Sequence, residues 1–160
     1  MAGNADNIIV GAATISFDAA DVGFTQGGAT IRYEPEWVEV FADQAVGVVA
    51  RRRSSERMFV TMGLLEASLT RIMQAFNQPS GQLVGSTLTL GYNNSCSFNT
   101  HAIVLVGVGP SCGTRTFTFP TCIAVSNTDY VMQRDEAVVF EIEFEVLKDA
   151  SGNFGTVVDS

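Results

Sequence analysis

The chain has 160 residues, a formal charge of −8 and an isoelectric point of about 4.4. Residues 1–160 suit a single domain, because roughly 100–200 residues per domain is usual. With 46% hydrophobic and only 16% charged residues, the composition excludes intrinsic disorder and is typical of subunits that cover one another's surfaces. Because 17 acidic residues oppose 9 basic ones, tight binding of nucleic acid through a general positive field is excluded.

No targeting segment is visible in the sequence. The N-terminus lacks the cationic stretch of a signal peptide, and no run approaches the ~18 apolar residues of a membrane span. We therefore expect a chain without a membrane anchor that folds in a cytoplasm. Cys96, Cys112 and Cys122 are odd in number and form no Cys-x-x-Cys motif, so neither a disulfide framework nor a zinc site is indicated.

Alternation of apolar and polar residues predicts strands along the first third of the chain. A first strand covers residues 8–17, and a second covers 29–41, where Pro35 indicates a sheet edge or a bulge. Residues 56–65 resume the alternation. The simplest account is a hairpin whose loop spans residues 42–55, and loops of that length are usually functional.

One helix is predicted over residues 66–77. Its apolar residues recur at i, i+3, i+4 and i+7, which indicates one buried stripe. Such a short helix would cover one face or one end of a sheet.

The remainder again predicts strands, at residues 84–92, 99–108, 114–125 and 136–147. The fold class is therefore α+β, mainly antiparallel β with one flanking helix. The residues expected in the core or packed on the helix are Trp37, Met58, Leu69, Ile72, Met73, Phe76, Phe140 and Phe144.

Little in the sequence points to catalysis. His101 is the sole histidine, and Cys96 lies five residues before it, so a Cys–His nucleophile pair is conceivable. No third group to orient the histidine is apparent, and nothing nearby completes a metal site. We expect His101 to be an ordinary strand residue, and we expect neither enzymatic activity nor a cofactor.

Two charged features remain. Glu141, Glu143 and Glu145 alternate along the last strand at roughly 7 Å spacing, which fits either a solvated outer face or a deliberately acidic wall. Arg51–Arg53 follow the apolar segment Val46–Val49 in the predicted loop. This segment is too apolar for a free loop, which favours docking of the arginines on an acidic surface of another copy over a solvated loop tip.

Several short motifs together resemble the major tail tube proteins of long-tailed bacteriophages, over nearly the whole chain. They are Asp21–Thr25 before Gly27-Gly28, Asp43-Gln44 with Gly47-Val48, Leu65–Leu69, Arg115–Phe119, and Val138–Leu147 with Lys148-Asp149 and Ser151-Gly152. The resemblance implies a β-sandwich or barrel-like domain, a fold shared with the type VI secretion tube protein. The Arg51–Arg53 cluster departs from the family's pattern.

The resemblance also implies a function. Members form hexameric rings that stack into the hollow tail tube of the virion, assembled in the host cytoplasm around a tape measure protein. Tail terminator and baseplate or distal tail proteins would be further partners, and DNA would pass through the lumen without specific binding.

On this reading the residues expected to face the lumen are Glu34, Glu36, Glu141, Glu143 and Glu145. Those expected in a ring-stacking loop are Asp43, Val46, Val48, Val49, Arg51, Arg52 and Arg53. The alternatives are a terminator or adaptor ring, a secretion-tube homologue, or a soluble β-sandwich binding module.

Overall fold

The structure is a computed structural model that describes residues 11, 13–66, 68–91, 99–125, 128–131 and 137–160. It is mainly antiparallel β with one α-helix, which confirms the predicted fold class. Cys96 and the predicted strand ends at 8–10, 92 and 136 lie outside the described residues. The strands are β1 (Thr14–Phe17), β2 (Ala20–Asp21), β3 (Thr25–Phe41), β4 (Val48–Leu64), β5 (Leu83–Val84), β6 (Thr87–Leu88), β7 (His101–Val108), β8 (Thr114–Ala124), β9 (Phe140–Val146) and β10 (Thr156–Asp159), and the helix is α1 (Leu69–Ala75).

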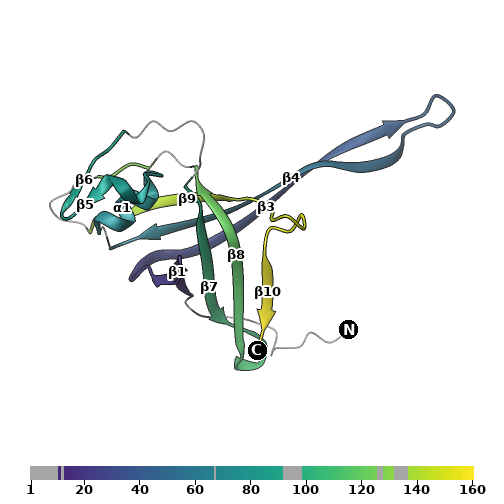
Figure 1. The fold of residues 1–160 in the computed structure, drawn as a ribbon. Helices are drawn as coiled ribbons and strands as arrows, with labels where there is room; N and C mark the ends of the chain where they lie inside the picture. Colours follow the sequence, from purple (N-terminus) through teal and green to yellow (C-terminus); the bar gives the residue numbers. More distant parts are fainter. Residues whose placement is uncertain (1–10, 12, 67, 92–98, 126–127, 132–136) are drawn as a thin grey trace.

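The main sheet has the strand order β2-β1-β7-β8-β9-β4-β3. Strand β8 divides it into two leaves, because its first half pairs with β10 and its last residues pair with β9. Figure 1 shows β7, β8 and β10 running together while β3 and β4 cross them. The sheet is not closed into a barrel. Strand β3 lies at its end, as Pro35 indicated.

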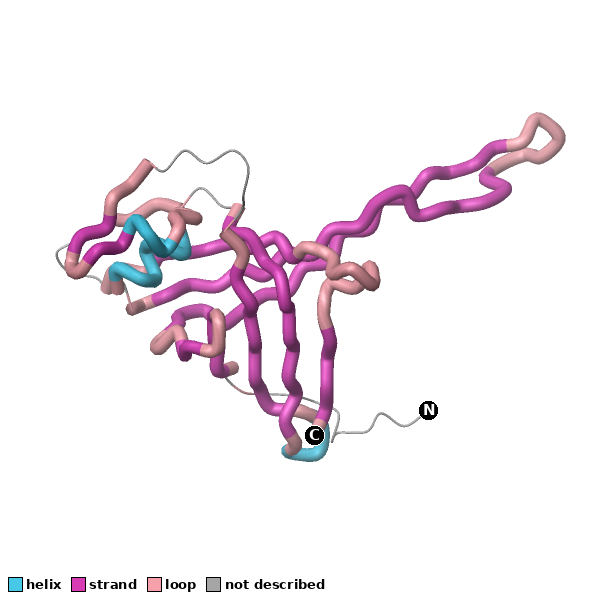
Figure 2. The backbone as a smooth tube through the Cα atoms, in the orientation of Figure 1, coloured by secondary structure: helices cyan, strands magenta, loops and turns pink. Residues whose placement is uncertain are grey.

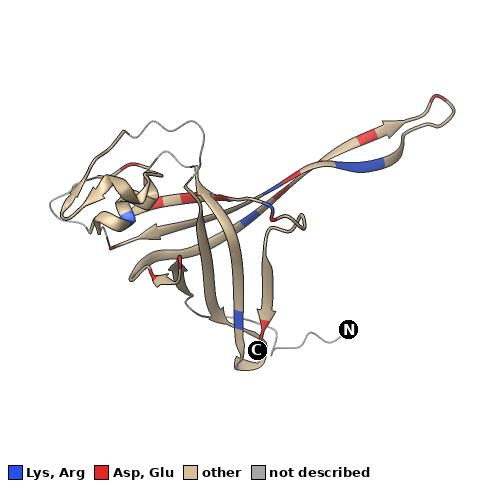
Figure 3. Cartoon of the chain, in the orientation of Figure 1, with Lys and Arg blue, Asp and Glu red and all other residues tan. Residues whose placement is uncertain are grey.

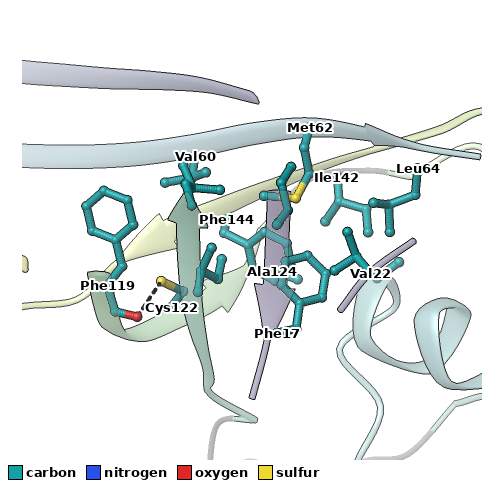
Figure 4. Close-up of a cluster of buried hydrophobic side chains, with 14 of the residues drawn as sticks. Phe17, Val22, Val60, Met62, Leu64, Phe119, Cys122, Ala124, Ile142 and Phe144 are labelled. Atoms are coloured by element: carbon teal, nitrogen blue, oxygen red, sulfur yellow. Dashed lines mark hydrogen bonds between the residues drawn. The ribbon is translucent and has the colours of Figure 1, made fainter. Parts of the chain in front are cut away.

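The core fills the space between the two leaves (Figure 4). On β9, Phe140, Ile142, Phe144 and Val146 are buried, and they alternate with the three glutamates as the sequence predicts. The Phe144 ring meets the ring of Phe17 edge-on, with centroids 5.1 Å apart. Of the residues expected in the core, Phe140 and Phe144 are buried, and Met58 is partly buried against them.

The predicted loop over residues 42–55 is wrong in extent. Residues 48–55 belong to β4 and pair with β3, so the connection is only 42–47. The sequence did not indicate that residues 48–55 are a strand, because Arg51–Arg53 show no alternation of apolar and polar residues. Trp37, expected in the core, is 57% exposed, because this part of the hairpin extends beyond the body.

The helix is also shorter than predicted, and it buries a different face. It begins after the N-cap Ser68, and its buried residues include Arg71 and Gln74 together with Met73. Leu69 is exposed, while Ile72 and Phe76 are only half-buried. The reason is Arg71, which hydrogen-bonds the Asp21 carbonyl oxygen and Gln74 Oε1, and stacks over the ring of Phe17.

Arg71 therefore holds the helix on the β1–β2 hairpin, and its loss is testable. We expect Arg71→Ala to lower the free energy of unfolding by ~1–3 kcal/mol, because the buried Gln74 amide oxygen and the part-buried Asp21 carbonyl contact lose their donor. Urea denaturation followed by circular dichroism measures this. Arg57→Ala is the control, since the Arg57 side chain is 66% exposed and its removal should stay within ~0.5 kcal/mol. Equal effects of the two substitutions would contradict the assigned role.

Candidate assembly interface

The outer part of the β3–β4 hairpin projects from the body as a two-stranded arm (Figure 2). We define the arm as residues 37–53. Every residue of the arm is exposed except Ala42, which is half-buried. An isolated two-stranded ribbon is marginally stable in water, so such an arm calls for a partner surface.

The exposed side chains of the arm are unusually apolar. The large hydrophobic ones are Trp37, Val38, Val40, Phe41, Val46, Val48 and Val49. Exposed apolar side chains gathered on one element in this way mark an interaction site in a folded protein. All seven members of the expected ring-stacking set, from Asp43 to Arg53, therefore lie on one exposed element, although not in one loop.

The three arginines of the arm have different surroundings. Arg51 Nη2 lies 2.6 Å from Glu39 Oε1, on the facing strand. Arg53 Nη1 lies 2.8 Å from Glu56 Oε2 and donates to the Tyr33 hydroxyl. No carboxylate in the described part of the chain pairs with Arg52. The blue segment of β4 in Figure 3 thus carries one cation that remains available to a partner.

Glu56 fastens the base of the arm to the body. Its carboxylate binds Lys148, the Tyr33 hydroxyl and Arg53, and the ammonium of Lys148 lies over the ring of Phe154. The hydrogen bond from Lys148, followed by that from Tyr33, lowers the pKa of Glu56 below its ordinary value. The arm therefore leaves the body at a defined, charge-stabilised point that sequence analysis did not identify.

This pKa shift predicts a pH dependence. Because the folded-state pKa of Glu56 is lowered, its stabilising contribution is fully present above the ordinary pKa of ~4.3 and is lost as pH falls through the folded value. The stability difference between wild type and Glu56→Gln should thus shrink on acidification below that pH. Urea denaturation at several pH values measures it, with Glu36→Gln as the control. A difference that stays constant would contradict the prediction.

The five glutamates expected to face a lumen do share one face, the outer face of β3, β4 and β9. Cross-strand pairing places Glu34 beside Arg57, and Glu145 beside Phe59. The face is not purely acidic, because Arg32 bridges Glu34 at 2.8 Å and Glu143 at 3.1 Å. Arg57 lies 3.8 Å from Glu145.

The glutamate face is therefore only partly neutralised. Two arginines offset five carboxylates on this face, which leaves it with a charge of −3. Glu141 is exposed, and no cation in the described part of the chain pairs with it. Ion pairs between exposed side chains contribute little to stability. A face that keeps its glutamates is consequently free to serve a function other than folding.

His101 is buried and hydrogen-bonded rather than poised for nucleophilic chemistry. Its Nδ1 lies 2.8 Å from Asp18 Oδ2, and its partner across the sheet is Cys122. Partial burial acts to raise the pKa of Asp18, but hydrogen bonds from His101 and the Ala102 amide lower it overall. Burial raises the pKa of the Cys122 thiol to about 12, so that thiol stays protonated and unreactive.

The resemblance motif at residues 21–25 forms a tight turn beside the helix. The Asp21 carboxylate accepts from the Gly23 amide at 2.9 Å, and the Glu66 carboxylate accepts from the Phe24 amide at 3.2 Å. Gly23 has a φ of 79°, and a Cβ there would come within 2.3 Å of the Glu66 carboxylate. The motif therefore serves the fold, and it places buried Val22 in the core.

The described residues lack two other kinds of feature. They contain no group of three or more histidine, cysteine, aspartate or glutamate side chains positioned to hold a metal ion. They also contain no helix with the length and hydropathy needed to cross a membrane.

Comparison with known proteins gives a similarity in structure. No protein-family model matches the chain, and no curated protein sequence is significantly similar to it. Its structure is similar to a chain of a solved structure described as "Virion of native gene transfer agent (GTA) particle", with a TM-score of 0.51, 12% sequence identity and 99% of both chains covered. At this identity the similarity establishes the fold: the chain is built like a component of a gene transfer agent virion.

Proposed function

We propose that this protein is a structural subunit of a phage-like tail tube, which forms hexameric rings that stack around a hollow lumen. The observation that carries the proposal is the projecting arm, which has exposed apolar side chains and a free arginine on a chain of charge −8. The shared fold with a virion chain supports it. The role is structural, not enzymatic.

Ring formation is supported by the open sheet. Strand β3 is 17 residues long and lies at the end of the sheet order. Such an edge presents unpaired N–H and C=O groups and would promote aggregation unless another strand covers it. Pairing between neighbouring subunits would close the six sheets into one wall, with the outer face of β3, β4 and β9 toward the lumen.

The further partners follow from this proposal. The tube would assemble in the host cytoplasm around a tape measure protein, between a baseplate or distal tail protein and a terminator. DNA would then pass the glutamate face without specific binding, because a face of net negative charge repels phosphate.

The first test asks whether the arm is required for stacking. We expect purified protein to form hollow tubes of uniform width in negative-stain electron microscopy across a concentration and salt series. A variant in which Asn-Gly replaces residues 38–52 should remain folded, because Trp37 and Arg53 are direct cross-strand partners and Asn-Gly suits a two-residue turn. It should form rings or monomers but no tubes. Tubes of normal length from this variant would contradict the proposal.

The second test concerns the lumen. Replacing Glu141, Glu143 and Glu145 together with glutamine removes the remaining net negative charge of the face, since Glu34 and Glu36 then balance Arg32 and Arg57. We expect particles with this variant to assemble normally but to release DNA more slowly, with Glu141→Gln alone giving a smaller effect. Time-resolved DNA release measures this, and unchanged release from the triple variant would remove the lumen assignment.

A further inference from the structure

The arm continues the core-facing side of the hairpin after the hairpin has left the core. Ile31 of β3 is paired with Val60, which is fully buried. Trp37 belongs to the same side, because its cross-strand partner Arg53 donates to the hydroxyl of Tyr33, two positions after Ile31. Phe41 follows Trp37 by four positions, so it shares that side. The two rings are 57% and 66% exposed.

An apolar cleft lies on this same side of β3, between β3 and the β8–β10 leaf. It consists of two adjoining hollows of about 300 Å³ and 290 Å³. Ile31 and Phe117 line both of them, and Phe119, Phe154 and Val157 line the first. Each hollow is about ten times a water molecule's share of the liquid, ~30 Å³. Each therefore has room for an aromatic side chain.

We propose that the cleft receives the arm of a second copy of this chain, with Trp37 and Phe41 seated against Phe117 and Val157. This inference rests on the proposed function and names the surface to which the arm binds. An arm placed beside the free edge of β3 would present to β8 and β10 the same face that β3 itself presents there. Trp37 is then buried on assembly, in an apolar core that two neighbouring subunits form together.

Charge favours a copy of this chain as the occupant. Three arginines against Glu39 and Asp43 give the arm a charge of +1, so the rest of a chain of −8 carries −9. The arm of one copy is therefore attracted to the body of another. Arm and cleft are different surfaces, so the contact is heterologous, and contacts of this kind continue from subunit to subunit unless a ring closes them.

Trp37 provides a direct probe, because it is the single tryptophan of the chain. On assembly of the wild-type protein we expect its fluorescence maximum to move to shorter wavelength and its quenching by acrylamide to fall severalfold. Assembled tubes in which Trp37 stays as quenchable as in free subunits would overturn the cleft docking but leave the tube proposal intact. Failure of the wild-type protein to assemble at all would overturn both.

Two neighbouring valines of β10 give a matched pair of variants. Val157 is 57% exposed and lines the cleft, whereas Val158 is 55% exposed and lines neither hollow. Both variants should fold, because neither position is buried in the free subunit. We expect Val157→Asp to abolish tubes and the fluorescence shift, and Val158→Asp to preserve them. Tubes from Val157→Asp with a normal shift would overturn the proposal.

A mixing experiment tests the direction of the contact. Trp37→Ala lacks a working arm and Val157→Asp lacks a working cleft, so neither should form tubes alone. Mixed together, the arm of the second fits the cleft of the first, and we expect complexes that stop after one junction, detected by analytical ultracentrifugation. Absence of any mixed complex would contradict a heterologous contact between arm and cleft.

Discussion

The structure depends on a mismatch in length between one hairpin and the body that supports it. Strands β3 and β4 have 17 residues each, but β9 covers β4 only from Met58 to Leu64. Beyond the contact of Glu56 with Lys148, no other strand of the described chain pairs with the hairpin, and the residues of the arm are exposed apart from half-buried Ala42. A ribbon of two strands that carries apolar side chains is stable only when something packs on it. The fold therefore leaves the arm without packing from the rest of the described chain.

Two features of the body accompany the projecting hairpin: the Glu56 contacts at its base and the opening of the sheet at β8. Glu56 gathers Tyr33, Arg53 and Lys148 at the point where the hairpin leaves the sheet, which fixes the direction of the arm. The division of β8 between β9 and β10 opens the sheet instead of closing it. This opening creates the cleft beside β3. The molecule therefore has both an arm without a partner and an unfilled cleft.

The charged side chains also fall into two groups, those paired within the chain and those left without a partner in its described part. Arg51 and Arg53 are used within their own hairpin, and Arg32 and Arg57 partly neutralise the glutamate face. Arg52 and Glu141 are left exposed without such partners in the described chain. A negative face that is moderated, rather than unopposed, carries less self-repulsion while still disfavouring contact with phosphate.

The sequence by itself determined the α+β class, the alternation on β9 and the common face of its glutamates, because a period of two sets the side of every strand residue. It also singled out Trp37 as a residue meant for burial. Only the tertiary structure decided where burial happens, since strand length relative to neighbouring strands depends on pairing between distant segments. For the same reason the sequence did not reveal that 48–55 are strand, that Arg71 rather than Leu69 faces the core, or that Glu56 anchors the arm: each depends on a partner on another element of the chain.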